Sequence, residues 1–193
     1  MTKNTAILIL AAGSSSRLGS PKQLVRYKQK SLIAHTVETA IEASIGPVHV
    51  ILGAYADDII DHCKGANTHY NSDWKSGMGS SLSYGLSTIL DAEDDVEGVL
   101  VLLCDQPYIK VSLLQEIVEL GLQTKGIIIS DYGTAAGPPS YFDKKYFAEL
   151  MLLSGDDGAK QIVKTNNSAV SKVSFPEGIV DIDTPDDLSK LHS

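Results

Sequence analysis

The feature that most constrains the fold is a set of short apolar runs that recur along the chain. "AILIL" and "VLVLL" are apolar at every position, so both faces of each predicted strand must be covered. Helical patterns separate these runs. The alternation predicts a three-layer α/β fold, with helices on both faces of a mainly parallel, twisted sheet. The predicted strands are Ala6–Leu10, Val48–Leu52, Val99–Leu103, Ile127–Ser130 and Val170–Ser174.

Three helices are predicted from apolar spacing and end signals. Ser31–Ala43 and Ser112–Leu122 repeat apolar residues close to one helix face. A last helix is predicted to start at Thr184, which can cap it, with Pro185 at its first position. The 193 residues suit one sizeable domain, so we predict a single domain over residues 1–193.

Composition excludes several classes of protein. The net charge of -8 argues against nonspecific nucleic-acid binding, which needs a basic surface. No apolar run approaches the roughly 20 residues that span a bilayer, so no membrane association is expected. The two cysteines are too few for a disulfide framework, which predicts a cytoplasmic protein. "AILILAA" could pass for a short signal peptide, but its apolar region is minimal.

The loop "AAGSSSRLGSPK" follows the first predicted strand, at the end where open α/β sheets bind ligands. It is not a Walker A motif, because five residues instead of four separate Gly13 from Gly19 and no Lys-Ser/Thr pair follows. It still has what a phosphate site needs. Gly13 lets a ligand approach the backbone, consecutive amides can converge on oxygens, and Arg17 and Lys22 supply charge. On spacing alone, a surface loop with two solvated cations remains an alternative.

"LAAGSSSRLGSPK" closely resembles the signature of the MobA-like nucleotidyltransferases, L-A-A/G-G-x-S-x-R-M/F-G-x-x-K. "NSDWKSGMGSSL", "CDQP", "GPPSYF", "LSGDDGAKQIV" and "DIDTPDDL" resemble later segments of that family and follow in the expected order. Together they resemble the molybdenum cofactor cytidylyltransferase branch, which implies a Rossmann-like nucleotidyltransferase fold. Two residues depart from the pattern: Leu18 replaces Met or Phe, and Pro138 stands where the branch more often has His.

The resemblance implies a reaction. A nucleoside monophosphate passes from a nucleoside triphosphate to a phosphorylated acceptor, molybdopterin cofactor, and pyrophosphate is released with the help of Mg²⁺. Ala12 matches the L-A-A-G form of cytidine users, which favours CTP over GTP. The expected partner is a molybdoenzyme or its chaperone.

The resemblance also implies roles for single residues. The catalytic residues are Arg17, Lys22 and Asp105, and the metal ligands are Asp105 and Asp183, with Asp181 as the rival of Asp183. Residues expected to bind the acceptor are Gly137, Pro138, Pro139, Gly155 and Asp156. Residues expected to bind the nucleotide are Leu10, Ala11, Ala12, Gly13, Ser14, Ser15, Ser16, Arg17, Lys22, Asn71, Gly77 and Ser80.

Simpler interpretations of the same residues remain open. Asp105 could end a strand and begin a turn before Pro107, and the acids near residue 183 could favour a helix start. Cys104 has no His in an evident partner motif, so a buried small apolar role is expected. Trp74 could stack on a base or anchor a loop, and the sequence does not decide between these.

Two other functions compete with cytidylyl transfer to molybdopterin. A nucleotidyltransferase for a sugar- or polyol-phosphate would keep Lys22 and Asp105 but would need a different acceptor pocket. A noncatalytic protein could bind nucleotide or finished molybdenum cofactor and deliver it to a partner enzyme. The intact set of Arg17, Lys22 and Asp105 argues against the second alternative.

Overall fold

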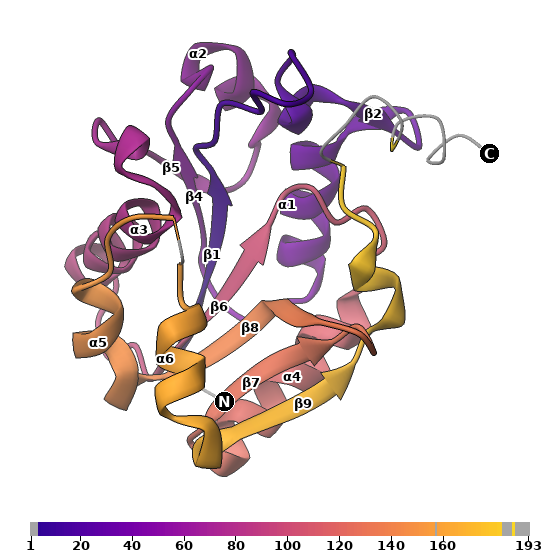
Figure 1. Cartoon of the computed structure of the whole chain (residues 1–193). Coiled ribbons are helices and arrows are strands. Elements are labelled where there is room, and N and C mark those ends of the chain that lie inside the picture. Colours follow the sequence, from indigo (N-terminus) through magenta and orange to yellow (C-terminus); the bar gives the residue numbers. More distant parts are fainter. Residues whose placement is uncertain (1–3, 157, 183–186, 188–193) are drawn as a thin grey trace.

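A seven-stranded sheet forms the centre of the molecule (Figure 1). The computed structural model describes residues 4–156, 158–182 and 187. The strand order is β5-β4-β1-β6-β8-β7-β9, and a separate two-stranded ribbon joins β2 (Arg26–Tyr27) to β3 (Lys30–Ser31). The sheet strands are β1 (Thr5–Ala11), β4 (Val48–Leu52), β5 (Asn67–Tyr70), β6 (Gly98–Leu103), β7 (Ile127–Asp131), β8 (Ala136–Asp143) and β9 (Val170–Ser174).

The predicted fold class is confirmed, and each of the five predicted strands is present. The pairs β1–β4, β1–β6, β4–β5 and β7–β9 are parallel, so the sheet is mainly parallel. β8 was not predicted, and it runs antiparallel to both of its neighbours, β6 and β7. Its Pro138 and Pro139 lie where the pairing with β7 shifts register, between the pairs Ile129–Ser140 and Ser130–Gly137. A proline lacks the N–H that a ladder needs, and such an irregularity accommodates it.

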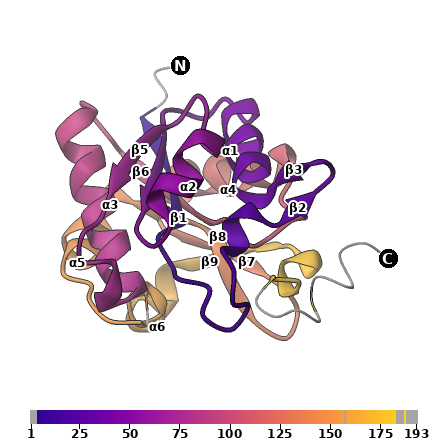
Figure 2. The ribbon, with the colours of Figure 1, turned by 90° about the horizontal axis from the view of Figure 1, so that it is seen from above.

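Helices cover both faces of the sheet (Figures 1 and 2). On one face pack α1 (Leu32–Glu42) and α4 (Val111–Thr124), and on the other pack α3 (Met78–Ala92), α5 (Phe147–Met151) and α6 (Lys160–Thr165). α2 (Ala56–Ile59) follows β4. The short 3₁₀ helices are η1 (Lys22–Leu24), η2 (Ile60–His62), η3 (Trp74–Ser76), η4 (Lys144–Tyr146), η5 (Asn167–Ala169) and η6 (Pro176–Ile179).

The continuous apolar runs are explained by two hydrophobic cores, one on each face. Ile7 and Ile9 of β1 point to the core beneath α1 and α4, whereas Leu8 and Leu10 point to the core beneath α3. Successive side chains of a strand face opposite sides, so a strand between two cores must be apolar at every position. The helix predicted at Ser31 is also present, and the Ser31 hydroxyl caps it by accepting the Ala34 N–H at 3.3 Å.

The carboxyl ends of the central strands meet at one edge of the sheet. The last residue of β1, Ala11, pairs with Leu52 of β4, and Leu10 pairs with Leu103 of β6. The loops that follow these strands are therefore neighbours in space. Within the described residues, no helix is both long and apolar enough to cross a membrane. The last predicted helix, from Thr184, lies outside the described residues except for Asp187.

Candidate active site

The loop after β1 is folded back on itself by hydrogen bonds to Ser15. Ser15 has a left-handed backbone (φ 52°), and its carbonyl accepts the N–H groups of Leu18 at 3.0 Å and Gly19 at 3.1 Å. Its hydroxyl accepts the N–H of Lys22 at 3.0 Å. A Cβ added to Gly13 would meet nothing within 4 Å, so the backbone there borders open space. The loop therefore has a fixed shape and an accessible backbone.

The side chain of Gln23 connects this loop to the end of β1, and Gln23 was not among the predicted site residues. The side chain is 1% exposed. Its amide nitrogen donates to the carbonyl of Ala11 at 3.0 Å and to that of Gly13 at 2.9 Å. The hydroxyl of Ser15 donates to its amide oxygen at 3.4 Å. One signal that could have indicated Gln23 is its position directly after Lys22, the last residue of the motif.

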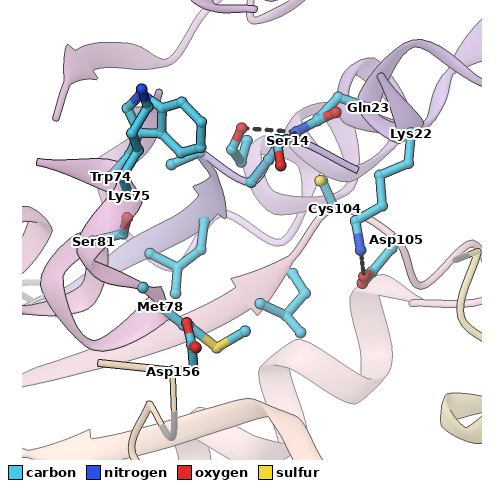
Figure 3. A pocket seen from close by; sticks show the side chains of 16 residues that line it. Ser14, Lys22, Gln23, Trp74, Lys75, Met78, Ser81, Cys104, Asp105 and Asp156 are labelled. Atoms are coloured by element: carbon cyan, nitrogen blue, oxygen red, sulfur yellow. Dashed lines mark hydrogen bonds and ion pairs between the residues drawn. The ribbon is translucent and has the colours of Figure 1, made fainter. Parts of the chain in front are cut away.

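The structure brings Lys22 and Asp105 together, although 83 residues separate them. Lys22 opens η1 and Asp105 lies in the turn after β6. The Lys22 Nζ lies 2.6 Å from Oδ2 of Asp105, and the two side chains are 19% and 9% exposed (Figure 3). The other carboxylate oxygen, Oδ1, is buried without a hydrogen-bond partner among the described residues. A half-buried cation and a buried carboxylate thus lie side by side next to the loop.

Asp105 fits one ligand position of a magnesium site. Mg²⁺ is usually held by one or two carboxylates, with water and substrate phosphates completing the octahedron. Among the described residues, no three acidic, His or Cys side chains form a group that could hold a metal alone. Asp183, the predicted second ligand, lies outside the described residues. A single carboxylate beside the loop after β1 suits a metal ion that is bound together with the phosphates of a substrate.

A first cavity of about 430 Å³ borders this loop, and Figure 3 shows the side chains that line it. Figure 3 shows Trp74 on the opposite side of the cavity from Lys22 and Asp105. Of the residues predicted to bind nucleotide, seven line it: Leu10, Ala11, Ala12, Gly13, Ser14, Lys22 and Gly77.

The other predicted nucleotide-binding residues lie around this cavity and are absent from its described lining. Ser15 shapes the loop, whereas Ser16 and Arg17 are exposed. Asn71 is buried, and its amide nitrogen donates to the hydroxyls of Ser80 at 3.0 Å and Ser81 at 3.2 Å. Asn71 and Ser80 therefore hold the segment that leads into α3.

The start of α3 packs against the segment that contains Gly155. Gly77 has a left-handed backbone (φ 99°), and a Cβ there would lie 2.4 Å from the carbonyl carbon and oxygen of Gly155. The Gly79 N–H donates to the same oxygen at 2.8 Å. Asp156, predicted to bind the acceptor, lines the first cavity together with residues predicted to bind the nucleotide. Trp74 lines this cavity and also packs on the core beneath α3, so it does anchor the loop.

A second cavity, of about 400 Å³, adjoins the first. Asp105 lines both cavities. Gly137 and Pro138, predicted to bind the acceptor, line the second one, whereas the Pro139 carbonyl accepts the hydroxyl of Ser130 at 2.8 Å. Much of its wall is apolar, with Leu10, Met78, Leu82, Val101, Leu103, Ile129, Phe142 and Val163 among the lining residues.

Cys104 lies beside Asp105 but is not prepared for nucleophilic attack. The residue is 3% exposed. Burial, with the charge of Asp105 as a smaller cause, raises the pKa of its thiol to about 12. The thiol is therefore protonated at neutral pH, and Cys104 acts as a small apolar residue.

The model of the MobA-like NTP transferase domain matches residues 7–171 of the chain. Purine catabolism protein PucB from Bacillus subtilis (strain 168) is 28% identical over 199 residues, covering 95% of this chain and 94% of PucB. Nicotine blue oxidoreductase from Paenarthrobacter nicotinovorans is 28% identical over 200 residues, with the same coverage of 95% and 94%.

The fold is also found in solved structures. Rv0371c from Mycobacterium tuberculosis H37Rv superposes with a TM-score of 0.85 at 28% identity, covering 97% of this chain and 96% of that one. A complex of Rv0371c with manganese matches with a TM-score of 0.81 at 26% identity, covering 97% of each chain. The family match spans most of the chain and confirms the resemblance inferred from the loop motif. The chain therefore belongs to the MobA-like NTP transferase family of nucleotidyltransferases.

Proposed function

We propose that the chain transfers a nucleoside monophosphate from CTP to a phosphorylated acceptor of the molybdopterin type and releases pyrophosphate. The observation that carries this proposal is the pair of Lys22 and Asp105, 2.6 Å apart beside the loop after β1. Asp105 also lines both cavities, so a nucleotide in the first and an acceptor in the second would meet there.

The reaction needs positioning and charge more than it needs a base. An oxygen of the acceptor phosphate forms a bond to the α-phosphorus, and the bond from that phosphorus to the pyrophosphate oxygen breaks. A terminal phosphate loses its second proton near about pH 6, so the attacking oxygen is already anionic at neutral pH. The chain therefore has to align the two phosphates and stabilise the charge that moves to pyrophosphate.

The residues of the first cavity suit these tasks. The amides of the Ala12–Ser16 segment and the guanidinium of Arg17 would hold the β- and γ-phosphates. Lys22 would turn from Asp105 to the bridge between the α- and β-phosphates, where charge develops. Asp105, with Asp183 as the proposed second ligand, would hold Mg²⁺, which neutralises phosphate charge when it is bound. The manganese complex of Rv0371c supports a divalent metal in this fold.

The second cavity supports a flat ring system as the acceptor. Its largely apolar wall offers few hydrogen-bond partners for the several hydroxyls of a sugar- or polyol-phosphate. A pterin ring can instead place its faces against aliphatic and aromatic side chains. Lys160 at the rim of this cavity can attract an anionic group.

The test is pyrophosphate release by the purified protein with Mg²⁺, CTP or GTP, and one of three acceptors. The acceptors are molybdopterin cofactor, a sugar phosphate and a polyol phosphate, and Asp105→Asn serves as the control with reduced activity. We expect release with CTP and molybdopterin cofactor. Release only with a sugar or polyol phosphate assigns that alternative, and binding without release assigns a delivery protein.

A further inference from the structure

Tyr132, just after β7, forms one wall of the second cavity and contacts two other parts of the chain. Its ring packs edge-on against Phe175, with 6.0 Å between the ring centroids. A Cβ added to Gly178 would lie 2.3 Å from Cε1 of Tyr132, so the backbone of η6 lies directly against the ring. The hydroxyl of Tyr132 donates to the carbonyl of Pro138 in β8.

Gln106 connects these parts to the turn that contains Asp105. The side chain is 4% exposed. Its amide nitrogen donates to the hydroxyl of Tyr132 at 3.0 Å and to the carbonyl of Gly178 at 3.1 Å. A carbonyl oxygen can only accept, so the nitrogen must be the atom that faces Gly178, and this fixes the orientation of the amide.

The direction of the hydrogen bond between Gln106 and the Tyr132 hydroxyl is fixed as well. Burial raises the pKa of Tyr132 to about 12, so its hydroxyl keeps its proton at neutral pH. The Tyr132 hydroxyl donates its hydrogen bond to the carbonyl of Pro138, and its oxygen accepts one from the amide nitrogen of Gln106. A continuous set of hydrogen bonds therefore joins Gly178, Gln106, Tyr132 and Pro138, and all four residues line the second cavity.

We propose that Gln106 is a positioning residue for the acceptor: its amide nitrogen fixes the walls of the second cavity relative to Asp105. This inference rests on the proposed function, in which the second cavity holds the acceptor. Gln106 is absent from the described lining of the first cavity, whereas it lines the second one. Its loss should impair use of the acceptor and leave nucleotide binding intact.

The chemistry of the amide suggests the variants. Its oxygen, Oε1, is buried without a hydrogen-bond partner among the described residues, so the nitrogen alone makes the connections. Gln106→Met keeps the length of the side chain and removes both donors. Gln106→Glu keeps the shape but places a carboxylate oxygen against the carbonyl of Gly178 and beside Asp105. Tyr132→Phe keeps the packed ring and removes only the link from Gln106 to Pro138.

Steady-state kinetics of pyrophosphate release then separate the two substrates, with molybdopterin cofactor and CTP each varied in turn. We expect both Gln106 variants to lower kcat/KM for the acceptor by about 10–100-fold, since small misplacements of a substrate have effects of this size. Tyr132→Phe should act in the same direction with a smaller effect. The Kd for CTP should stay within about twofold of the wild-type value.

Gln115→Met is the control for the loss of one such hydrogen bond, at an exposed side chain. Gln115 also donates its amide nitrogen to a backbone carbonyl, that of Ala43, at 3.1 Å, but it connects α4 to the end of α1. This control should leave kcat/KM for both substrates unchanged. A general effect of losing one such hydrogen bond would appear in the control as well.

A second measurement tests the structural part of the inference independently of the proposed function. In Gln106→Met, backbone amides of residues 175–182 should exchange with deuterium faster, because the side chain holds this segment at Gly178. The loop at residues 12–21 should exchange as in the wild type. If no acceptor yields pyrophosphate with the wild-type protein, the proposed function is wrong, and faster exchange then supports only the structural part of the inference, that Gln106 holds the cavity wall at Gly178. Unchanged exchange in residues 175–182, or an unchanged kcat/KM for an acceptor that the wild type uses, would overturn the inference.

Discussion

The pair formed by Lys22 and Asp105 leads to a quantitative prediction about stability. The side chains are 19% and 9% exposed, and 2.6 Å separates the charged atoms. Two unit charges about 4 Å apart attract each other by about 4 kcal/mol near a protein surface. Removing one partner of a buried pair costs about 3–5 kcal/mol. Water around the exposed part of Lys22 screens some of this attraction, so Lys22→Met should lower the free energy of unfolding by about 2–3 kcal/mol.

Urea unfolding near neutral pH, followed by circular dichroism, measures this loss. Lys30→Met is the matched control, because Lys30 pairs with Glu38 but the two side chains are 53% and 44% exposed. The control should lose less than about 1 kcal/mol. Combining Lys22→Met with Asp105→Asn should restore most of the stability, because no unpaired carboxylate is then buried.

Turnover of Lys22→Ala should fall by about 10²–10³-fold, as when one donor to a transition state is lost.

Two results would refute this reasoning. One is a Lys22→Met variant as stable as the wild type, and the other is a double variant no more stable than the single one. The sequence alone implies little effect on folding, because a charge on an exposed loop stabilises little. The structure changes that expectation, because it places Lys22 largely out of water against a buried carboxylate.

Three further predictions concern metal, base and pH. Asp105→Asn should lower the activity and weaken its dependence on Mg²⁺, since an amide is a poorer ligand for a hard dication. Rates are measured against Mg²⁺ concentration, and a curve identical to that of the wild type would contradict this. The wild type should have a higher kcat/KM with CTP than with GTP, and this preference should be smaller in Ala12→Gly. One methyl group can account for a preference of about 10–200-fold, and kcat/KM values measured with both nucleotides test this. Burial and the neighbouring His69 lower the pKa of His49 from 6.5. The unfolded chain then binds more protons, so the unfolding temperature should fall as the pH drops below about 6.5, and a flat profile between pH 6.5 and 5.5 would contradict this.

The central part of the fold could be predicted because its strands lie between two cores. β1, β4 and β6 are apolar at nearly every position, and short runs of this kind are typical of strands covered on both faces. β5 escaped prediction because it lies at the edge of the sheet, where "NTHY" needs no apolar face. β8 escaped because "AGPPSYFD" begins with residues typical of turns, and its place between β6 and β7 depends on contacts distant in sequence.

The candidate site divides in the same way. Residues within the loop motif could be found because the motif is local, and the structure places Gly13, Ser14 and Lys22 around one cavity. Gln106 could not be assigned, because a buried glutamine has a role only through the backbone groups that it meets. Gly178, whose carbonyl accepts from Gln106, lies 72 residues further along the chain, and the sequence does not show that the fold brings the two together.

That Asp105 lines both cavities has a consequence for how such a protein diverges over evolution. The first cavity is built mainly from residues 10–23, 74–81 and 103–105, whereas most of the second comes from residues 129–181, around the antiparallel strand β8. Mutations in the later part of the chain can therefore reshape the second pocket without disturbing the loop that faces the first. Among the described residues, Leu10, Met78, Leu103 and Asp105 line both cavities, so these positions must serve both. An ancestral protein of this design could exchange one small-molecule partner for another and retain the rest of its machinery.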